Sequence, residues 1–211
     1  MSKCLICSDN FNPFVDFGRM PIANAFSSKE ELINEYTFAM KVGFCEKCKM
    51  VQLVEQPDRE KMFHDNYAFF SSTSNYMINH FNNFASSVIS LQNLNVNSFV
   101  VEVGCNDGIM LQSFLSSKIP CLGVEPSQNV ANVAMEKGIK VITEFFDQTL
   151  AQKISKMHQK ADAILSANVM CHIPYIHSIY DGVKTLLKDD GVFIFEDPYL
   201  GEIIEKTSFD Q

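Results

Sequence analysis

The sequence predicts an α/β protein: a parallel sheet of about five strands covered by helices, preceded by a small metal-binding module. Three observations predict it. Short apolar runs alternate with helical stretches from Phe99 onward, two pairs of cysteines lie near the N-terminus, and an amphipathic stretch separates the two regions. We expect three segments: a metal-binding module over residues 1–62, a helical bridge over 63–96 and a ligand-binding domain over 97–211.

Composition limits the classes of function. The chain of 211 residues is 46% hydrophobic, which is enough for a packed core, and its formal charge of −8 argues against a mainly electrostatic nucleic-acid binder. No apolar run reaches the roughly 20 residues that a membrane span needs. The N-terminus also lacks the apolar core of a signal peptide. We therefore expect a cytoplasmic protein that binds neither nucleic acid nor a membrane.

The cysteine spacing predicts a structural zinc site. Cys4 and Cys7 form one C-x2-C pair, Cys45 and Cys48 form a second, and residues 8–44 separate the pairs. Two such turns supply the tetrahedral four-sulfur shell that zinc accepts, with no open position left for catalysis. In a reducing compartment, metal binding is favoured over disulfides. The alternatives are four ordinary reduced thiols or two surface disulfides.

The bridge contains one predicted helix. Hydroxyl residues at 71–74 are N-cap candidates, and Tyr67, Tyr76 and His80 cluster around them. A capped helix that joins two domains explains most of this pattern. Hydroxyl donors at a helix N-terminus could also receive a phosphate, so both interpretations stay open. The helix is predicted from one apolar stripe: Met77, Phe81, Phe84, Val88 and Leu91.

The second domain alternates strands with single helices, which implies right-handed crossovers and a parallel sheet. Ligands of such sheets bind beyond the carboxyl ends of the strands, near the switch in strand order. The stretches that follow the first, second and fourth strands are therefore candidate site segments. Strands are predicted at 99–104, 121–127, 139–146, 161–168 and 192–198, and helices at 108–117, 129–138, 148–160 and 176–191.

The turn "GCNDG" after the first strand indicates the kind of cofactor. Dinucleotide sites place a glycine where this chain has Asn106, and a side chain there hinders a pyrophosphate. S-adenosylmethionine has no pyrophosphate. Glu125, after the second strand, can accept hydrogen bonds from both ribose hydroxyls, and Glu102 and Asp107 are acidic neighbours for an ammonium and a sulfonium. The alternatives are a tight turn in a non-binding fold and, last, a nicotinamide-dependent oxidoreductase.

With these motifs in view, the chain resembles the S-adenosylmethionine-dependent C-methyltransferases of nucleotide-linked deoxysugars. A zinc module joined to a G-x-N-D-G turn is more specific than either part. The resemblance implies a Rossmann-like class I methyltransferase sheet, here incomplete, with structural Zn²⁺ and S-adenosylmethionine as cofactors. The matching pieces are "CLIC", "MPIANAF", "CEKCKMVQL", "NYAFFSSTSNYMINHF", "VVEVGCNDG", "GVEPSQNVA", "GIKVITEFF", "ANVMCHI" and "GVFIFEDPYL".

The resemblance also implies the residues of the site. A nucleotide sugar is the expected substrate, faced by Tyr67, Ser71, Ser72, Tyr76 and His172. The residues expected at the cofactor are Glu102, Gly104, Asn106, Asp107, Gly108, Glu125, Pro126, Ser127, Phe146 and Asn168.

The expected chemistry needs a base. A sugar carbon becomes nucleophilic only when a proton beside a keto group is removed, and the enolate then attacks the sulfonium methyl. His172 is a candidate for this acid–base role, and its alternative is a hydrogen-bonding wall of the cleft. In the family, a "YHEH"-like stretch that carries the base follows "F-D", whereas this chain stops at "SFDQ". We therefore expect the main base beyond residue 211, with cofactor binding retained and methyl transfer impaired.

The sequence leads to three further expectations. Five strands instead of seven leave an exposed sheet edge, through which the chain could form a homo-oligomer. A methyltransferase that acts on another small molecule is one rival function. A non-catalytic zinc-ribbon and S-adenosylmethionine-binding module is the other.

Overall fold

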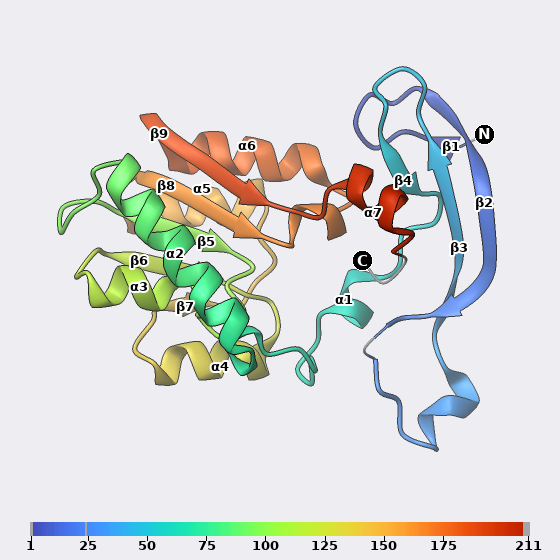
Figure 1. The fold of residues 1–211 in the computed structure, drawn as a ribbon, viewed down its shortest axis with the longest axis horizontal. Coiled ribbons are helices and arrows are strands. Elements are labelled where there is room, and N and C mark those ends of the chain that lie inside the picture. The colour runs from blue at the N-terminus through green and yellow to red at the C-terminus, as the bar shows by residue number, and fades with distance from the viewer. Residues whose placement is uncertain (1, 24, 209–211) are drawn as a thin grey trace. The chain divides into compact units, whose positions relative to one another are not determined.

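The computed structural model describes residues 2–23 and 25–208, which divide into two compact units (Figure 1). The first unit comprises the chain up to Phe69 with the short stretches Ser127–Asn129 and Pro174–His177, and the second comprises the remainder. Residues 209–211, the last three letters of the "SFDQ" stretch, lie outside the described residues.

The first unit is built on a four-stranded antiparallel sheet in the order β1-β2-β3-β4. Each cysteine pair lies in the connection of a hairpin, the first between β1 and β2 and the second between β3 and β4. The small core around these connections includes Phe11, Cys4 and Cys45. The elements are β1 (Ser2–Lys3), β2 (Asn10–Pro21), a 3-10 helix (Glu31–Asn34), β3 (Thr37–Phe44), β4 (Val51–Leu53) and α1 (Arg59–Met62).

The second unit contains a five-stranded sheet in the order β7-β6-β5-β8-β9, with every neighbouring pair parallel. The five predicted parallel strands are thus confirmed. The strand order reverses between β5 and β8, so the carboxyl ends of these two strands form the switch point at which such sheets bind ligands. The strands are β5 (Val100–Val103), β6 (Cys121–Val124), β7 (Val141–Ile142), β8 (Ala161–Ala167) and β9 (Leu187–Glu196).

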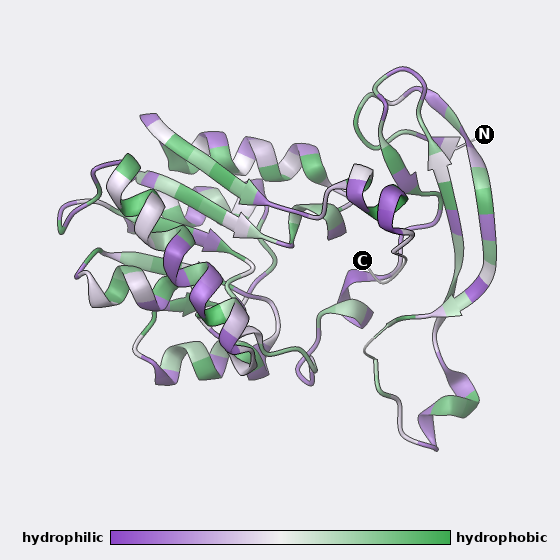
Figure 2. Cartoon of the chain, viewed as in Figure 1, coloured by the Kyte–Doolittle hydropathy of each residue, from purple (hydrophilic) through white to green (hydrophobic). Residues whose placement is uncertain are grey.

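Helices cover both faces of this sheet (Figure 1). Its strands are largely hydrophobic (Figure 2), as is typical of a parallel sheet buried on both faces. Ile194 packs into the cluster that α2 and α3 share, whereas the neighbouring Phe193 contacts Tyr180 of α6. The helices are α2 (Asn75–Leu91), α3 (Leu111–Ser116), α4 (Gln128–Glu136), α5 (Gln148–Met157), α6 (Ile176–Leu186) and α7 (Leu200–Lys206), with 3-10 helices at Ser71–Thr73 and Met170–His172.

The predicted bridge helix is α2. Its N-cap is Ser74, whose hydroxyl oxygen accepts a hydrogen bond from the Met77 N–H at 3.4 Å. Phe81 and Val88 of the predicted stripe are buried, but Leu91 is 76% exposed. The stripe ends early because the chain turns after the helix and Leu94 enters the core in its place, with its N–H on the Ile89 carbonyl at 3.0 Å.

The helix predicted at 176–191 ends five residues earlier than expected. Leu187 pairs with Ala161 of β8, and a bulge separates this pair from the next one. The Lys188 ammonium holds the bulge by a 2.7 Å contact to the Asp162 carboxylate. Gly191 belongs to the strand, where a Cβ would lie 2.9 Å from the Ala161 carbonyl oxygen. The prediction was wrong because Gly191 was taken as the end of the helix, whereas pairing with β8 begins at Leu187.

In the part of the chain that the structure describes, no helix combines the length and apolar character needed to cross a bilayer.

Candidate cofactor and metal sites

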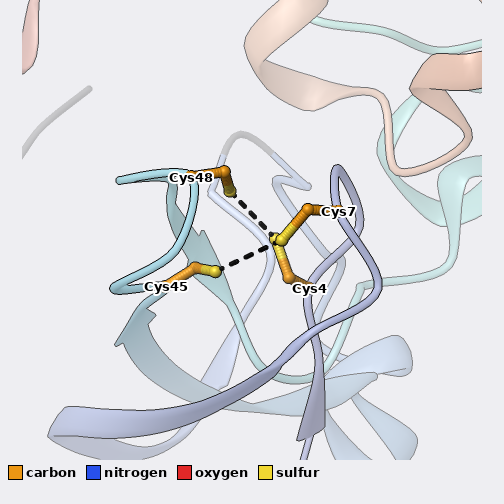
Figure 3. Close-up of side chains that lie close together, drawn as sticks. All are labelled: Cys4, Cys7, Cys45 and Cys48. Carbon is orange, nitrogen blue, oxygen red and sulfur yellow. Dashed lines mark hydrogen bonds between the residues drawn. The ribbon is translucent and has the colours of Figure 1, made fainter.

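The four predicted zinc ligands converge in the first unit (Figure 3). Their sulfur atoms all lie within 4.8 Å of one another, and the Cys4–Cys48 and Cys7–Cys45 sulfur pairs are 3.5 Å apart. Four sulfurs at about 2.3 Å from one zinc ion lie just under 4 Å apart in a tetrahedron. The arrangement therefore fits a tetrahedral zinc ion held by four thiolates.

The surroundings of Cys4 favour the thiolate that a metal requires. Burial opposes its ionisation, but hydrogen bonds from the backbone at Cys7 and Ile6 and from the Gln52 and Cys48 side chains together outweigh that cost and lower the pKa of Cys4 to about 6. The Gln52 amide donates to the Cys4 sulfur at 3.1 Å. This buried glutamine further accepts a hydrogen bond from the Leu5 N–H at 2.9 Å, so it supports the first metal turn from β4.

In the turn after β5, every second residue from Gly104 to Gly108 has a left-handed backbone conformation. Gly104 has a φ of +72°, Asn106 of +48° and Gly108 of +78°. Asparagine tolerates this region better than most residues with a side chain, which explains its place between two glycines. A Cβ on Gly104 would lie 2.3 Å from a Val169 methyl group, so glycine is required there for space as well as conformation.

Three carboxyl groups are buried beside this turn. Glu102 is 3% exposed, Asp107 1% and Glu125 5%. Burial and the nearby Glu125 and Asp107 carboxylates raise the pKa of Glu102 to about 8, so its neutral form is favoured at neutral pH. Glu125 Oε2 accepts a hydrogen bond from the Asn106 N–H at 3.0 Å. The three acidic side chains thus lie together at the carboxyl ends of β5 and β6.

The turn also holds the hydroxyl-rich segment that precedes α2. Asn106 Oδ1 accepts the Ser71 N–H at 2.9 Å, and Asp107 Oδ2 accepts both the Ser72 N–H, at 3.1 Å, and the Ser72 hydroxyl. Lys137, which the sequence analysis did not single out, contacts Asp107 and Ser72. Ser71 and Ser72 are thus brought to the predicted cofactor turn.

The other predicted cofactor residues follow neighbouring strands. Pro126 and Ser127 follow Glu125 after β6, and Ser127 is fully buried. Asn168, at a φ of +55°, follows β8, and its N–H donates to the carbonyl of Glu196 at 2.7 Å. Phe146 is buried in the connection after β7.

The remaining residues predicted to face the substrate have varied surroundings. Tyr67 belongs to the first unit, where its carbonyl accepts from the Asn129 side chain at 2.7 Å. Tyr76, in the first turn of α2, is 78% exposed. His172 lies in the 3-10 helix after β8, where desolvation lowers its pKa against the opposing charge of Asp197.

The sequence analysis missed one hydrogen-bonded pair of this region. His80 Nε2 on α2 lies 2.9 Å from both carboxylate oxygens of Glu196, the last residue of β9. His80 was noted only for its closeness to the hydroxyl residues in sequence. Its partner could not be found, because the pair joins residues that are 116 positions apart.

A parallel sheet with a switch point, a left-handed turn and buried acids is typical of domains that bind a nucleoside cofactor. Comparison with known families shows which kind of domain the second unit is. Residues 4–63 match the family described as "Putative zinc binding domain", and residues 73–210 match the family described as "Methyltransferase domain". The second match covers more than half of the chain, so the protein belongs to this methyltransferase family. The predicted order of zinc module and methyltransferase domain is confirmed.

The individual proteins that the chain resembles share less than a third of its residues. The chain is 29% identical over 212 residues to C-methyltransferase NovU of Streptomyces niveus, a match that covers 100% of this chain and 50% of that protein. It is 27% identical over 99 residues to a ubiquinone biosynthesis O-methyltransferase of Glaesserella parasuis, covering 44% of this chain and 42% of the relative. The chain thus spans about half the length of the curated relatives that it matches.

Among solved structures, the PH0226 protein of Pyrococcus horikoshii OT3 superposes with a TM-score of 0.53 at 16% identity, covering 66% of this chain and 62% of that one. At this identity the likeness shows the fold alone. It agrees with the parallel sheet of the second unit.

Proposed function

We propose that the protein takes part in S-adenosylmethionine-dependent methyl transfer to a carbon of a nucleotide-linked keto-deoxysugar. The observation that carries the cofactor assignment is the cluster of three buried carboxyl groups around the turn after β5. The substrate class rests on the similarity, along the whole of this chain and half of the relative, to a protein named as a C-methyltransferase, and on the resemblance to sugar C-methyltransferases.

The residues of the turn fit this cofactor. Among the described residues, Glu102 Oε2 and Asp107 Oδ1 are buried and have no hydrogen-bond partner. A buried oxygen atom without a hydrogen bond destabilises the folded chain unless a ligand supplies a donor or a cation to it. The cofactor brings an ammonium, a sulfonium and two ribose hydroxyls. We assign the ribose hydroxyls to Glu125 and the cationic groups to Asp107 and to Glu102, whose ionised form a bound cation would stabilise.

The reaction divides into what the cofactor supplies and what the chain supplies. When bound, S-adenosylmethionine supplies an electrophilic methyl group. The chain holds it by the turn and the acids, and must provide a group that accepts the proton from the carbon beside the keto group. His172 is our candidate for that contact, because its lowered pKa keeps the imidazole neutral, and only a neutral ring can accept a proton.

Calorimetry tests the cofactor assignment. We expect S-adenosylhomocysteine and S-adenosylmethionine to bind the wild-type chain, and Glu125→Gln to weaken binding about tenfold or more, because a hydrogen bond to a charged group contributes roughly 1.5–3 kcal/mol. Glu136→Gln, an exposed residue of α4, is the matched control and should bind as the wild type does. Absence of binding to the folded, zinc-containing wild type would refute the assignment.

Isotope labelling tests the substrate class. The protein is incubated with a nucleotide-linked 4-keto-deoxysugar and methyl-labelled S-adenosylmethionine, and the product is read by NMR. Because methyl transfer by this chain is expected to be impaired, we expect a low yield, with the transferred label as a methyl group on a sugar carbon. A label on oxygen would contradict carbon transfer. Cofactor binding without any transfer would favour the non-catalytic alternative for this chain.

A further inference from the structure

Lys137 lies where the end of α4 meets the turn after β5. The helix is closed by Gly138, at a φ of +88°, and the Ile139 N–H donates to the Ala134 carbonyl at 3.1 Å, which is a common way to end a helix. A lysine at a helix C-terminus is ordinarily explained by the helix dipole. Here its side chain is 28% exposed and is directed to another element.

The Lys137 ammonium contacts three oxygen atoms. It donates to the Asp107 carbonyl at 2.8 Å and to the Ser72 hydroxyl oxygen at 3.2 Å, and it lies 3.6 Å from Asp107 Oδ2. An ammonium has three donors, so this set can use all of them. The Ser72 hydroxyl accepts from Lys137 and donates to Asp107 Oδ2, so its orientation is fixed by both neighbours.

The two oxygens of the Asp107 carboxylate therefore have different roles. Oδ2 accepts from Ser72 and faces Lys137. Oδ1 is buried and, among the described residues, has no hydrogen-bond partner. A cation or donor of a ligand at the turn would bind Oδ1, while Oδ2 keeps its contacts with residues before α2. The Asp107 carboxylate thus connects the ligand side of the turn with the segment before α2.

We propose that Lys137 is a positioning residue, which through Asp107 and Ser72 couples occupation of the cofactor turn to the position of residues 70–74. This segment contains Ser71 and Ser72, which the sequence predicts to face the substrate, and it leads directly into α2. The inference rests on the proposed function, since it takes S-adenosylmethionine as the ligand of the turn. Its consequence is that the cofactor orders the substrate-facing segment before the sugar nucleotide binds.

Hydrogen exchange measures this coupling without a substrate. The amides of Ser71 and Ser72 donate to the side chains of the turn, so their exchange rates report whether residues 70–74 are held. In the wild type we expect saturating S-adenosylhomocysteine to slow exchange of this segment about tenfold, within the usual range of coupling between sites. In Lys137→Met the ligand-dependent slowing should largely disappear.

Two further variants make the result specific. Lys140→Met removes an exposed lysine near the same helix end and should keep the full ligand-dependent slowing. Ser72→Ala removes the hydroxyl that joins Lys137 to Asp107 Oδ2, while Lys137 and the Ser72 N–H keep their contacts with Asp107. It therefore tests the same coupling if Lys137→Met does not fold. A merely structural lysine would change exchange equally with and without ligand.

Equal ligand-dependent slowing in the wild type, Lys137→Met and Ser72→Ala would overturn the inference. Calorimetry on the same samples separates this failure from that of the proposed function. If the folded wild type does not bind S-adenosylhomocysteine, both fall. If it binds and the coupling is unchanged by the variants, only the positioning role of Lys137 falls.

Discussion

The buried carboxyl of Glu102 makes the stability of the second unit depend on pH. Glu102 lies in the centre of the sheet on β5, and its pKa is raised to about 8 from a usual value of 4.5. Between these values the folded chain keeps a proton that the unfolded chain has lost. Stability from this group is therefore lost as the pH rises, at up to about 1.4 kcal/mol per pH unit, and the loss levels off above the folded pKa.

Glu102→Gln removes this dependence, because the amide is neutral at every pH and has nearly the shape of the protonated acid. From the two pKa values, we expect the variant to be more stable than the wild type by about 2 kcal/mol near pH 6 and by about 5 kcal/mol near pH 9. Urea unfolding followed by far-ultraviolet circular dichroism at both pH values, with zinc present throughout, gives this difference directly.

Glu136→Gln is the matched control, since it removes an exposed carboxyl from α4. Its stability relative to the wild type should not change with pH. If the free energies of unfolding of Glu102→Gln and the wild type differ by the same amount near pH 6 and near pH 9, the Glu102 carboxyl is already ionised in the folded chain. That result would refute our account of the acid cluster.

Two further predictions concern the metal and the turn. Cys45→Ser should reduce zinc, measured by elemental analysis of unstripped protein, from about one ion per chain to nearly none, whereas Cys171→Ser should retain it; a metal-free wild type would contradict the zinc assignment. Gly104→Ala should destabilise the protein by about 2 kcal/mol or more in urea unfolding, because it adds a clash with Val169 to a strained φ. Gly18→Ala has a similarly strained φ, but no atom of the described residues lies within 4 Å of its added Cβ, so an equal loss of stability in both variants would exclude the clash.

The fold could be predicted largely because its signals are local. Apolar runs and single helices alternate along the chain, and each strand pairs in parallel with strands that the crossover rule places beside it. The errors were at boundaries. Leu91 fits the helical stripe but lies beyond the core, and the pairing of Leu187 with β8 overrides the helical pattern that precedes it.

The candidate site could be predicted only in part. The cysteine spacing and the acidic turn are contiguous motifs, so the sequence points to them directly. The contacts of Lys137 and Ser72 join residues that are 65 positions apart, and those of Ser72 and Asp107 join residues 35 apart. Such contacts depend on how α4 and the segment before α2 pack against the turn, and no local pattern records that packing.

A structure of the chain with S-adenosylhomocysteine tests the central claim most directly. Our account predicts the adenosyl group at the turn after β5, with the Glu125 carboxylate within hydrogen-bond distance of the ribose hydroxyls and Asp107 Oδ1 near the ammonium. A structure in which Glu125 is directed away from the ligand, or in which side chains fill the space beside the turn, would contradict it.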